Sequence, residues 1–470
     1  MQIVRWNMKR GSVRIERIEI QNFKNVKKGQ ITLKNNRKKY KSSILGIYGQ
    51  NGSGKTALID AILLLKYALC GQAVPSQYAD YIHVEEDYAK LKFDLSVTIP
   101  ESGISYDVIY EFKLKKEPDE GEQNLSEAEH DKAVIFDEIL SCSYVYGEDK
   151  CRMSHLIRTD VKEVFAPKSK YQELLGRDKE LETDLQVAKR LTSATSRSFI
   201  FSRELLTAVR QNCKQPIYEE LLELLVQYGN FELFVINTQN NGLIAMNALP
   251  LAFKYESENA GAVGNIMLPL DKAETIPKEA ADLIEKMIPN MNKVLSQIVP
   301  GLTISMYNFG PQVLKNGKTG CRVQLMSRKN SREIPLRYES EGIKKIVSIL
   351  QLLIVVYNKP SITVAIDELD SGVFEYLLGE LLRIISEKGK GQLIFTSHNL
   401  RPLETLDRGF IAFTTTNPEN RYMRMTNVKE NNNLRDFYYR DIVLGEQNEV
   451  VYEPTNNYEI ALAFREAGEM

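Results

Sequence analysis

The sequence predicts an α/β fold in which a mixed sheet is joined to an antiparallel β-subdomain and a helical insertion. Three observations support this fold class. A glycine-rich stretch at 49–56 lies between a short apolar run and a long apolar helix pattern. A second apolar run, at 361–366, ends in two carboxylates. Apolar and polar residues alternate at 13–33 and again at 89–114, which indicates antiparallel strands.

Composition and charge indicate a soluble globular chain. Of the 470 residues, 43% are hydrophobic, which is enough for a large core, and the length suggests roughly three domains or one domain with a large insertion. The net charge of −1 excludes nucleic-acid binding through overall charge, so any such contact needs a local basic patch. Five scattered cysteines without a C-x-x-C pair, and no apolar run near about 18 residues, predict a cytoplasmic protein without a membrane span.

The stretch Gly49–Thr56 (GQNGSGKT) fits G-x-x-x-x-G-K-[ST], the pattern of a phosphate-binding P-loop. The run at 43–48 predicts a buried strand before it, and the run at 57–69 predicts a helix after it. Backbone N–H groups and the positive end of the helix dipole then form an anion site, in which Lys55 reaches the β- and γ-phosphates and the Thr56 hydroxyl binds Mg²⁺. The residues expected to bind the nucleotide here are Gly49, Asn51, Gly52, Ser53, Gly54, Lys55 and Thr56.

The second apolar run has the pattern of a Walker B motif, because Asp367 and Glu368 follow it directly. A carboxylate at the end of a strand can hold Mg²⁺ through its water shell. The next carboxylate, on the loop, can orient and deprotonate the attacking water. We assign the first role to Asp367 and the second to Glu368, which predicts hydrolysis of a nucleoside triphosphate.

The segment between the two motifs predicts a mostly helical insertion and a return to the α/β core. Apolar residues have helical spacing through 173–212 and 217–228 without sustained heptads, which argues against a long coiled coil. The basic residues of this part allow two interpretations, a patch that faces nucleic acid or helix surfaces paired with the interleaved acids. The predicted units are an N-lobe at 1–115, the insertion at 116–265, a C-lobe at 266–415 and a tail at 416–470.

Smaller elements complete the prediction. Residues 115–133 are polar and acidic and predict a surface loop. The tail predicts a helix at 458–467, which either packs on the protein's own core or docks a neighbouring subunit or effector. The remaining predicted elements are a helix at 278–299, punctuated by Pro289, and strands at 302–307, 321–326, 409–414 and 422–426.

The strand I-x-I-x-N-F-K-N at 18–25, followed by G-x-N-G-S-G-K-T, resembles the start of the SMC, RecF and OLD ATPases of the ABC-ATPase class. The resemblance implies an ABC-type P-loop ATPase domain. It also implies that Ser340 and Gly342, in an abbreviated S-x-G signature, bind the γ-phosphate of ATP held by the P-loop of another subunit. Asp370 then lies in the D-loop, which crosses the dimer interface, and His398, at the end of an apolar strand pattern, is the switch histidine that contacts the γ-phosphate.

Other positions match this resemblance less closely. Lys24 stands where these families often carry an arginine near the nucleotide. The Q-loop glutamine that completes Mg²⁺ coordination is Gln72 or Gln77 in this interpretation, and the spacing does not choose between them. Family members often read D-E-x-x-x-x-L-H at the D-loop, whereas this chain has no histidine there.

The resemblance implies Mg-dependent ATP hydrolysis, with ATP and Mg²⁺ as cofactors and Glu368, Lys55 and His398 as catalytic residues. It implies a homo-oligomer, a dimer or larger, in which ATP is sandwiched between subunits. The chain is most similar to stand-alone OLD-like ATPases of anti-phage systems of the PARIS or AbiL type, which implies a separate effector protein, Toprim or other nuclease-like, and a DNA or phage-protein trigger. No D-x-D pair follows residue 400, so no Toprim domain is expected here. The alternative is a RecF- or SMC-like DNA-repair ATPase that acts on DNA; a transporter subunit is disfavoured by the abbreviated signature and the large insertion.

Overall fold

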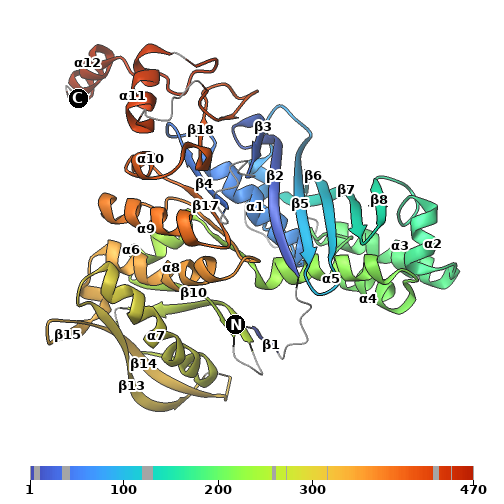
Figure 1. The fold of residues 1–470 in the computed structure, drawn as a ribbon, viewed down its shortest axis with the longest axis horizontal. Helices are drawn as coiled ribbons and strands as arrows, with labels where there is room; N and C mark the ends of the chain where they lie inside the picture. The colour runs from blue at the N-terminus through green and yellow to red at the C-terminus, as the bar shows by residue number, and fades with distance from the viewer. Residues whose placement is uncertain are drawn as a thin grey trace.

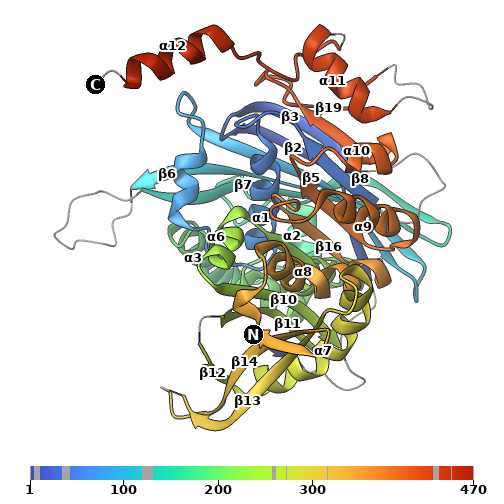
Figure 2. The same ribbon diagram turned by 90° about the vertical axis from the view of Figure 1, so that its left-hand side faces the viewer.

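The chain folds into a mixed α/β structure, as the sequence predicts, with its C-terminal helices at one end and two smaller sheets at the other (Figure 1). Figure 2 shows the same two ends from the side. The computed structural model describes residues 2–4, 11–33, 43–118, 131–256, 261–270, 272–314, 316–426, 433–445 and 447–468.

A six-stranded sheet carries both predicted nucleotide motifs. In spatial order its strands are β19 (Tyr422–Met423), β18 (Ile411–Thr414), β4 (Ser43–Tyr48), β17 (Gln392–Thr396), β16 (Thr363–Ile366) and β9 (Leu233–Ile236). All neighbours are parallel except β19, which pairs antiparallel with β18. Parallel strands are buried on both faces, which explains why these strands are continuous apolar runs. The P-loop strand β4 therefore lies one strand away from the Walker B strand β16, with β17 between them.

A second, antiparallel sheet lies on the opposite side of helix α1 (Lys55–Leu69). Its strands in spatial order are β3 (Val26–Thr32), β2 (Ser12–Phe23), β5 (Tyr88–Ile99), β6 (Ile104–Pro118), β7 (Asp131–Tyr146) and β8 (Asp149–Arg158). The strand pair predicted at 13–33 and the hairpin predicted at 89–114 are confirmed, because alternate residues of these strands are buried.

The prediction of a mostly helical segment from residue 116 is wrong for β7 and β8, which extend this sheet. The alternation of buried and exposed residues in β7 is interrupted by three consecutive buried residues, 133–135, and by a shift of register opposite β6. The sequence of β7 therefore does not show the period of two that predicts a strand. The central part of the predicted surface loop, 119–130, lies outside the described residues, and its flanks belong to β6 and β7.

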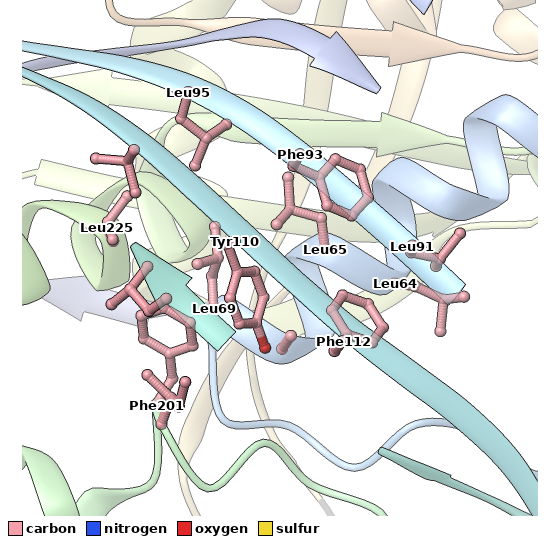
Figure 3. Close-up of a cluster of buried hydrophobic side chains, with 14 of the residues drawn as sticks. Leu64, Leu65, Leu69, Leu91, Phe93, Leu95, Tyr110, Phe112, Phe201 and Leu225 are labelled. Atoms are coloured by element: carbon pink, nitrogen blue, oxygen red, sulfur yellow. The ribbon is translucent and has the colours of Figure 1, made fainter. Parts of the chain in front are cut away.

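Helix α1 is apolar on almost every side because both sheets pack on it. Figure 3 shows its leucines against the inner faces of β5 and β6, with side chains from the helical insertion closing the cluster. Burial of each such side chain stabilises the fold by about 1.5–3 kcal/mol. The labelled members of the cluster are Leu64, Leu65, Leu69, Leu91, Phe93, Leu95, Tyr110, Phe112, Phe201 and Leu225.

The helical part of the insertion consists of α2 (Lys168–Leu175), α3 (Lys179–Ala194), α4 (Arg203–Asn212) and α5 (Pro216–Phe231). These helices have 8 to 16 residues, which agrees with the prediction that no long coiled coil occurs here. Lys170 pairs with Glu173 at 2.6 Å, and Arg210 pairs with Glu223 at 3.3 Å. These two basic side chains therefore belong to paired helix surfaces, the second of the two interpretations.

The lobe that carries the predicted signature contains both strands and helices. Strands β10 (Ala248–Glu256) and β11 (Gly261–Pro269) form a hairpin, so the helical prediction is also wrong near its end. Helix α7 (Lys278–Ile298) continues through Pro289, which confirms the helix predicted at 278–299. The other elements are β1 (Gln2–Val4), η1 (Ser76–Tyr81), α6 (Thr238–Ala245), β12 (Glu274–Pro277), β13 (Thr303–Val313), β14 (Thr319–Lys329), β15 (Arg332–Pro335), η2 (Leu336–Tyr338), α8 (Glu341–Asn358), α9 (Glu375–Lys388), α10 (Pro402–Thr405) and η3 (Arg408–Phe410).

Two buried polar side chains join separate parts of the fold. The amide of Gln392 accepts from Ile15 N at 2.8 Å and donates to Ile15 O at 2.9 Å, so β17 is joined to β2 of the other sheet. The carboxylate of Glu138 on β7 accepts from Tyr110 Oη at 2.7 Å and from Phe199 N at 2.6 Å. Because buried polar groups are costly unless they are hydrogen-bonded, both residues fix how these parts pack.

The predicted hairpin of β18 and β19 connects the C-lobe to the tail, which continues into α11 (Leu434–Leu444) and α12 (Asn457–Gly468). Helix α12 has no buried residue, so of the two interpretations of this segment, packing on the protein's own core is wrong. Within the described residues, no helix is both long and apolar enough to cross a membrane.

Candidate active site

The P-loop connects β4 to α1 in a backbone conformation that favours glycine. Gly49, Gly52 and Gly54 have φ angles of 149°, 75° and 95°, a region that residues with a Cβ rarely adopt. Lys55 Nζ donates hydrogen bonds of 2.8 Å to the carbonyl oxygens of Gly49 and Gln50. The ammonium is thus held over the loop, where phosphate oxygens would take over the same donors.

Thr414 and Tyr422, in the hairpin formed by β18 and β19, contact the P-loop directly. The hydroxyl of Thr414 is hydrogen-bonded to that of Ser53, and a Cβ added at Gly49 would lie 1.9 Å from Thr414 Oγ1. Tyr422 Oη donates to Gly54 O at 2.8 Å. The sequence analysis missed both residues, because only the pairing of β18 with β4 brings the tail to this loop.

The Walker B carboxylates are organised by a threonine on the neighbouring strand. Thr396 Oγ1 donates to Asp367 Oδ1 at 2.5 Å and accepts from Glu368 N at 2.8 Å. Thr396 is level with Asp367 because Ile366 pairs with Phe395 in parallel register. Glu368 has a φ of 49°, so the backbone turns sharply between the two carboxylates. The sequence analysis missed Thr396, although a threonine two residues before the predicted switch histidine was a usable signal.

The predicted D-loop aspartate and switch histidine lie side by side. Asp370 Oδ2 accepts hydrogen bonds from the backbone amides of His398 at 3.1 Å and Asn399 at 3.0 Å. The His398 side chain is exposed at the end of β17, the strand next to the P-loop strand β4. Both residues therefore stand at the carboxyl ends of the central strands, the edge at which ligands bind in such sheets.

The predicted signature residues start helix α8. Ser340 is the N-cap, and its Oγ accepts from Ile343 N at 3.4 Å. Gly342 packs directly against the loop that follows the Walker B motif, because a Cβ there would lie 2.0 Å from Gly372 O. Ser340 itself is exposed, so another molecule can reach its hydroxyl and the N-terminus of the helix.

Lys24, Gln72 and Gln77, the remaining predicted residues, lie on segments other than the P-loop. Lys24 forms an ion pair with Asp60 of α1 and lies 4.0 Å from the centre of the Tyr81 ring. Gln72 follows the C-terminal end of α1, about 22 Å from the P-loop along the helix axis. Gln77 is exposed in η1, and the structure does not choose between the two glutamines.

The P-loop lysine lies in the electrostatic field of the carboxylates in and after the Walker B motif. Burial lowers the pKa of Lys55 to about 8, while the charges of Asp367, Asp370 and Glu368 act in the opposite direction. The same three carboxylates act on Lys345 of α8, a residue that the sequence analysis did not single out. Two lysines from different elements therefore share one group of carboxylates.

The residues present fit a bound Mg²⁺. Asp367 Oδ2 is buried and has no hydrogen-bond partner among the described residues, although its other oxygen has one. A hard oxygen ligand of this kind, next to a phosphate-binding loop, suits Mg²⁺, which keeps several waters and takes one or two carboxylates plus phosphate oxygens. Asp367 and Thr56 would hold the ion, and it would supply positive charge to the phosphates.

A glycine loop at the start of α1 and paired carboxylates after β16, all at the same edge of a largely parallel sheet, define a P-loop nucleoside triphosphatase. The family comparison makes this more specific. The model of the AAA ATPase domain family AAA_15 matches residues 14–401, and the chain belongs to this family. No curated protein matches the sequence.

Solved structures with similarity to this chain include SMC head domains and a recombination mediator protein. The Smc head bound to the C-terminal winged-helix domain of ScpA is 15% identical, with 87% of this chain and 97% of that chain covered and a TM-score of 0.39. The SMC head domain from Thermotoga maritima is 15% identical, with 88% and 99% covered and a TM-score of 0.37. The recombination mediator protein RecF with ATP is 15% identical, with 82% and 94% covered and a TM-score of 0.33. Likeness at these values carries no weight for function.

Proposed function

We propose that this protein is a Mg-dependent ATP hydrolase that assembles by sandwiching ATP between two copies and thereby controls a separate effector protein in anti-phage defence. The observation that carries the hydrolytic part is the arrangement of Asp367 and Glu368 on one threonine hydroxyl, in the electrostatic field of the P-loop lysine. Such an arrangement separates a carboxylate that holds metal from one that faces water.

In the proposed mechanism each residue acts on charge or on a proton. The P-loop amides and Lys55 bind the β- and γ-phosphates and stabilise the charge that develops on them. Glu368, which follows the strand in a turn with positive φ, orients the attacking water and accepts its proton. His398 contacts the γ-phosphate from the end of β17. Mg²⁺, when bound at Asp367 and Thr56, neutralises phosphate charge.

The sandwich is supported by the surface around the signature. Tyr338, Phe374 and Tyr376 are all more than half exposed, and they flank Ser340 and the loop that ends at Gly372 in the sequence. Exposed aromatic side chains of this kind are enriched in protein–protein interfaces. A second copy that presents its P-loop to Ser340 would cover them.

Control of an effector is supported by the tail. Helix α12 leaves Tyr458 and Phe464 exposed by 74% and 78%, and no residue of this helix is buried. The segment before it is attached to the P-loop, because Gln50 Oε1 accepts from Glu453 N at 2.9 Å. Because of this link, a change of the P-loop on ATP binding or hydrolysis can change the position of α12 and so its contact with a partner. The anti-phage setting itself rests on the resemblance to OLD-like ATPases.

The alternative, a DNA-repair ATPase, is not favoured by the helical insertion. Lys189 donates to the carbonyl oxygens of Val161 and Glu163 at 2.8 and 2.9 Å, and Lys170 and Arg210 are in ion pairs. These three cations are therefore engaged within the chain. Strong stimulation of ATP hydrolysis by duplex DNA, with a steep dependence on salt, would favour this alternative.

The test uses tagged Glu368→Gln protein, with Lys55→Ala as the control that lacks the phosphate ligand. We expect Glu368→Gln to lower the hydrolysis rate by about 100-fold or more while it retains ATP, and to form a stable ATP-dependent dimer or larger assembly by light scattering. Proteins that co-purify with this assembly from the native cell are then identified. A stoichiometric nuclease-like partner would support effector control, and DNA with repair proteins would support the alternative. A monomer with bound ATP would contradict the sandwich.

A further inference from the structure

Lys345 is a buried cation that the proposed mechanism does not use. It lies on α8 and is only 2% exposed. An ammonium group is costly to bury unless negative groups balance its charge, and lysine is rarely found buried without such partners. The surroundings of Lys345 should therefore contain its counter-charge.

The packing of α8 directs Lys345 toward the Walker B loop. Gly342, at the start of this helix, is so close to Gly372 that a Cβ would meet its carbonyl oxygen at 2.0 Å. Lys345 follows Gly342 by three residues and therefore lies on the same helix face. Long side chains in helices point back toward the N-terminus, which brings the Lys345 ammonium to the loop 367–372.

This loop presents three carboxylates and two unsatisfied oxygens. Asp367 Oδ2 and Asp370 Oδ1 are buried and have no hydrogen-bond partner among the described residues. Burial lowers the pKa of Lys345 to about 8, and the charges of Glu368, Asp367 and Asp370 oppose this decrease. Three carboxylates in one short loop repel one another unless a cation balances them. The same three carboxylates also act on Lys55.

We propose that Lys345 is a positioning residue, the resident counter-ion that keeps the Walker B carboxylates together and competes with Mg²⁺ for their charge. Lys55 is engaged by two P-loop carbonyl oxygens, whereas Lys345 approaches from the signature helix. The Mg²⁺ requirement of the site therefore depends on a residue of the signature helix. This inference rests on the proposed Mg-ATP site.

Lys344 is a matched control in the same helical turn. It is also buried, at 7% exposure, and it donates to Asn247 Oδ1 at 3.3 Å. Lys344→Met thus removes a buried positive charge one residue away that makes a different contact. Lys345→Arg keeps the charge at the proposed position, and Lys345→Met removes it with little change in side-chain length.

The experiment compares full-length wild type, K345M, K345R and K344M. The first measurement is the Mg²⁺ concentration that gives half-maximal binding of a fluorescent non-hydrolysable ATP analogue. We expect K345M to need about fivefold less Mg²⁺ than wild type, because a competing charge is gone. K345R keeps the competing charge, and K344M removes a charge that contacts Asn247 instead. Both variants should therefore stay within about twofold of the wild-type Mg²⁺ requirement. An unchanged or increased Mg²⁺ requirement in K345M would overturn the proposal.

The second measurement is thermal unfolding in EDTA without nucleotide, which does not depend on the proposed function. K345M should unfold at a lower temperature than wild type, and E368Q should reduce this loss in the double variant, because one repelling carboxylate is neutralised. If K345M lowers the unfolding temperature by the same amount in the wild-type and E368Q proteins, the counter-ion role is overturned. Should K345M fail to fold, recovery of folding in K345M/E368Q supports the proposal, and continued failure overturns it. Wild type without Mg-dependent ATP binding would instead contradict the proposed function.

Discussion

The carboxylate of Asp370 holds the backbone of His398, with Oδ2 accepting from the His398 amide at 3.1 Å and from the next amide at 3.0 Å. The loop after the Walker B strand is thereby joined to the segment that presents the histidine. A movement of either segment would be transmitted to the other.

We expect Asp370→Ala to lower kcat for ATP hydrolysis by about ten- to 100-fold, because the loss of this carboxylate displaces the His398 segment. His398→Ala should cause a similar loss. The double variant should be no slower than the slower single variant, since the two residues act as a unit. Steady-state ATPase assays of the three variants provide the measurement. Losses that multiply in the double variant would show that Asp370 acts independently of His398.

Thr396 satisfies both Walker B residues with one hydroxyl, so Thr396→Val should affect metal binding as well as stability. The change leaves Asp367 Oδ1 and Glu368 N without this partner, at an expected loss of about 1–3 kcal/mol in the free energy of unfolding. Thr396→Ser, which keeps the hydroxyl, is the control. Urea denaturation and the Mg²⁺ dependence of ATP hydrolysis are measured for both variants. Equal behaviour of the valine and serine variants would mean that the hydroxyl has no role in orienting Asp367.

Gln50 connects the P-loop to the tail through both atoms of its amide, since Nε2 also donates to Glu453 O at 3.4 Å. We expect Gln50→Ala to speed amide hydrogen exchange in residues 447–456. In wild type, an ATP analogue should change exchange in this segment, and Gln50→Ala should abolish that response. Gln186→Ala, a change at an exposed glutamine in α3, should leave the response intact. A response that survives in Gln50→Ala would exclude this residue as the link.

Glu138 predicts a pH dependence of stability. Burial raises its pKa above the ordinary value of 4.5, although hydrogen bonds from Ser198, Tyr110 and the backbone amides of Phe199 and Ile200 oppose the shift. The folded protein therefore retains this proton where the unfolded chain has lost it. Its contribution is fully present below pH 4.5 and is lost as the pH rises through the raised pKa.

We therefore expect the free energy of unfolding of wild type, measured relative to Glu138→Gln, to decrease as the pH rises from acidic toward neutral values. Glutamine at this position does not titrate, so the comparison cancels the contributions of other groups. Denaturant unfolding of both proteins at matched pH values is the measurement. A difference that is constant with pH would mean that Glu138 titrates alike in the folded and unfolded states.

The local parts of the site were predictable from the amino-acid sequence. The P-loop and the Walker B pair each consist of consecutive residues whose spacing fixes a strand, a turn and a loop, so Lys55, Asp367 and Glu368 were predictable. The alternating strands of the antiparallel sheet were predictable for the same reason, because burial of one face imposes a period of two. Strand β7 was missed where irregular register removed that period.

The distant residues that complete the site became visible only in the folded chain. Thr396, Thr414 and Tyr422 reach the motifs only because β17 and β18 flank β4, and strand order is a long-range property that no local pattern encodes. The burial of Lys345 follows from the packing of α8 against the Walker B loop. The exposure of α12 was also not predictable from its sequence. An amphipathic pattern shows which side of a helix is apolar, but not whether the same chain covers that side.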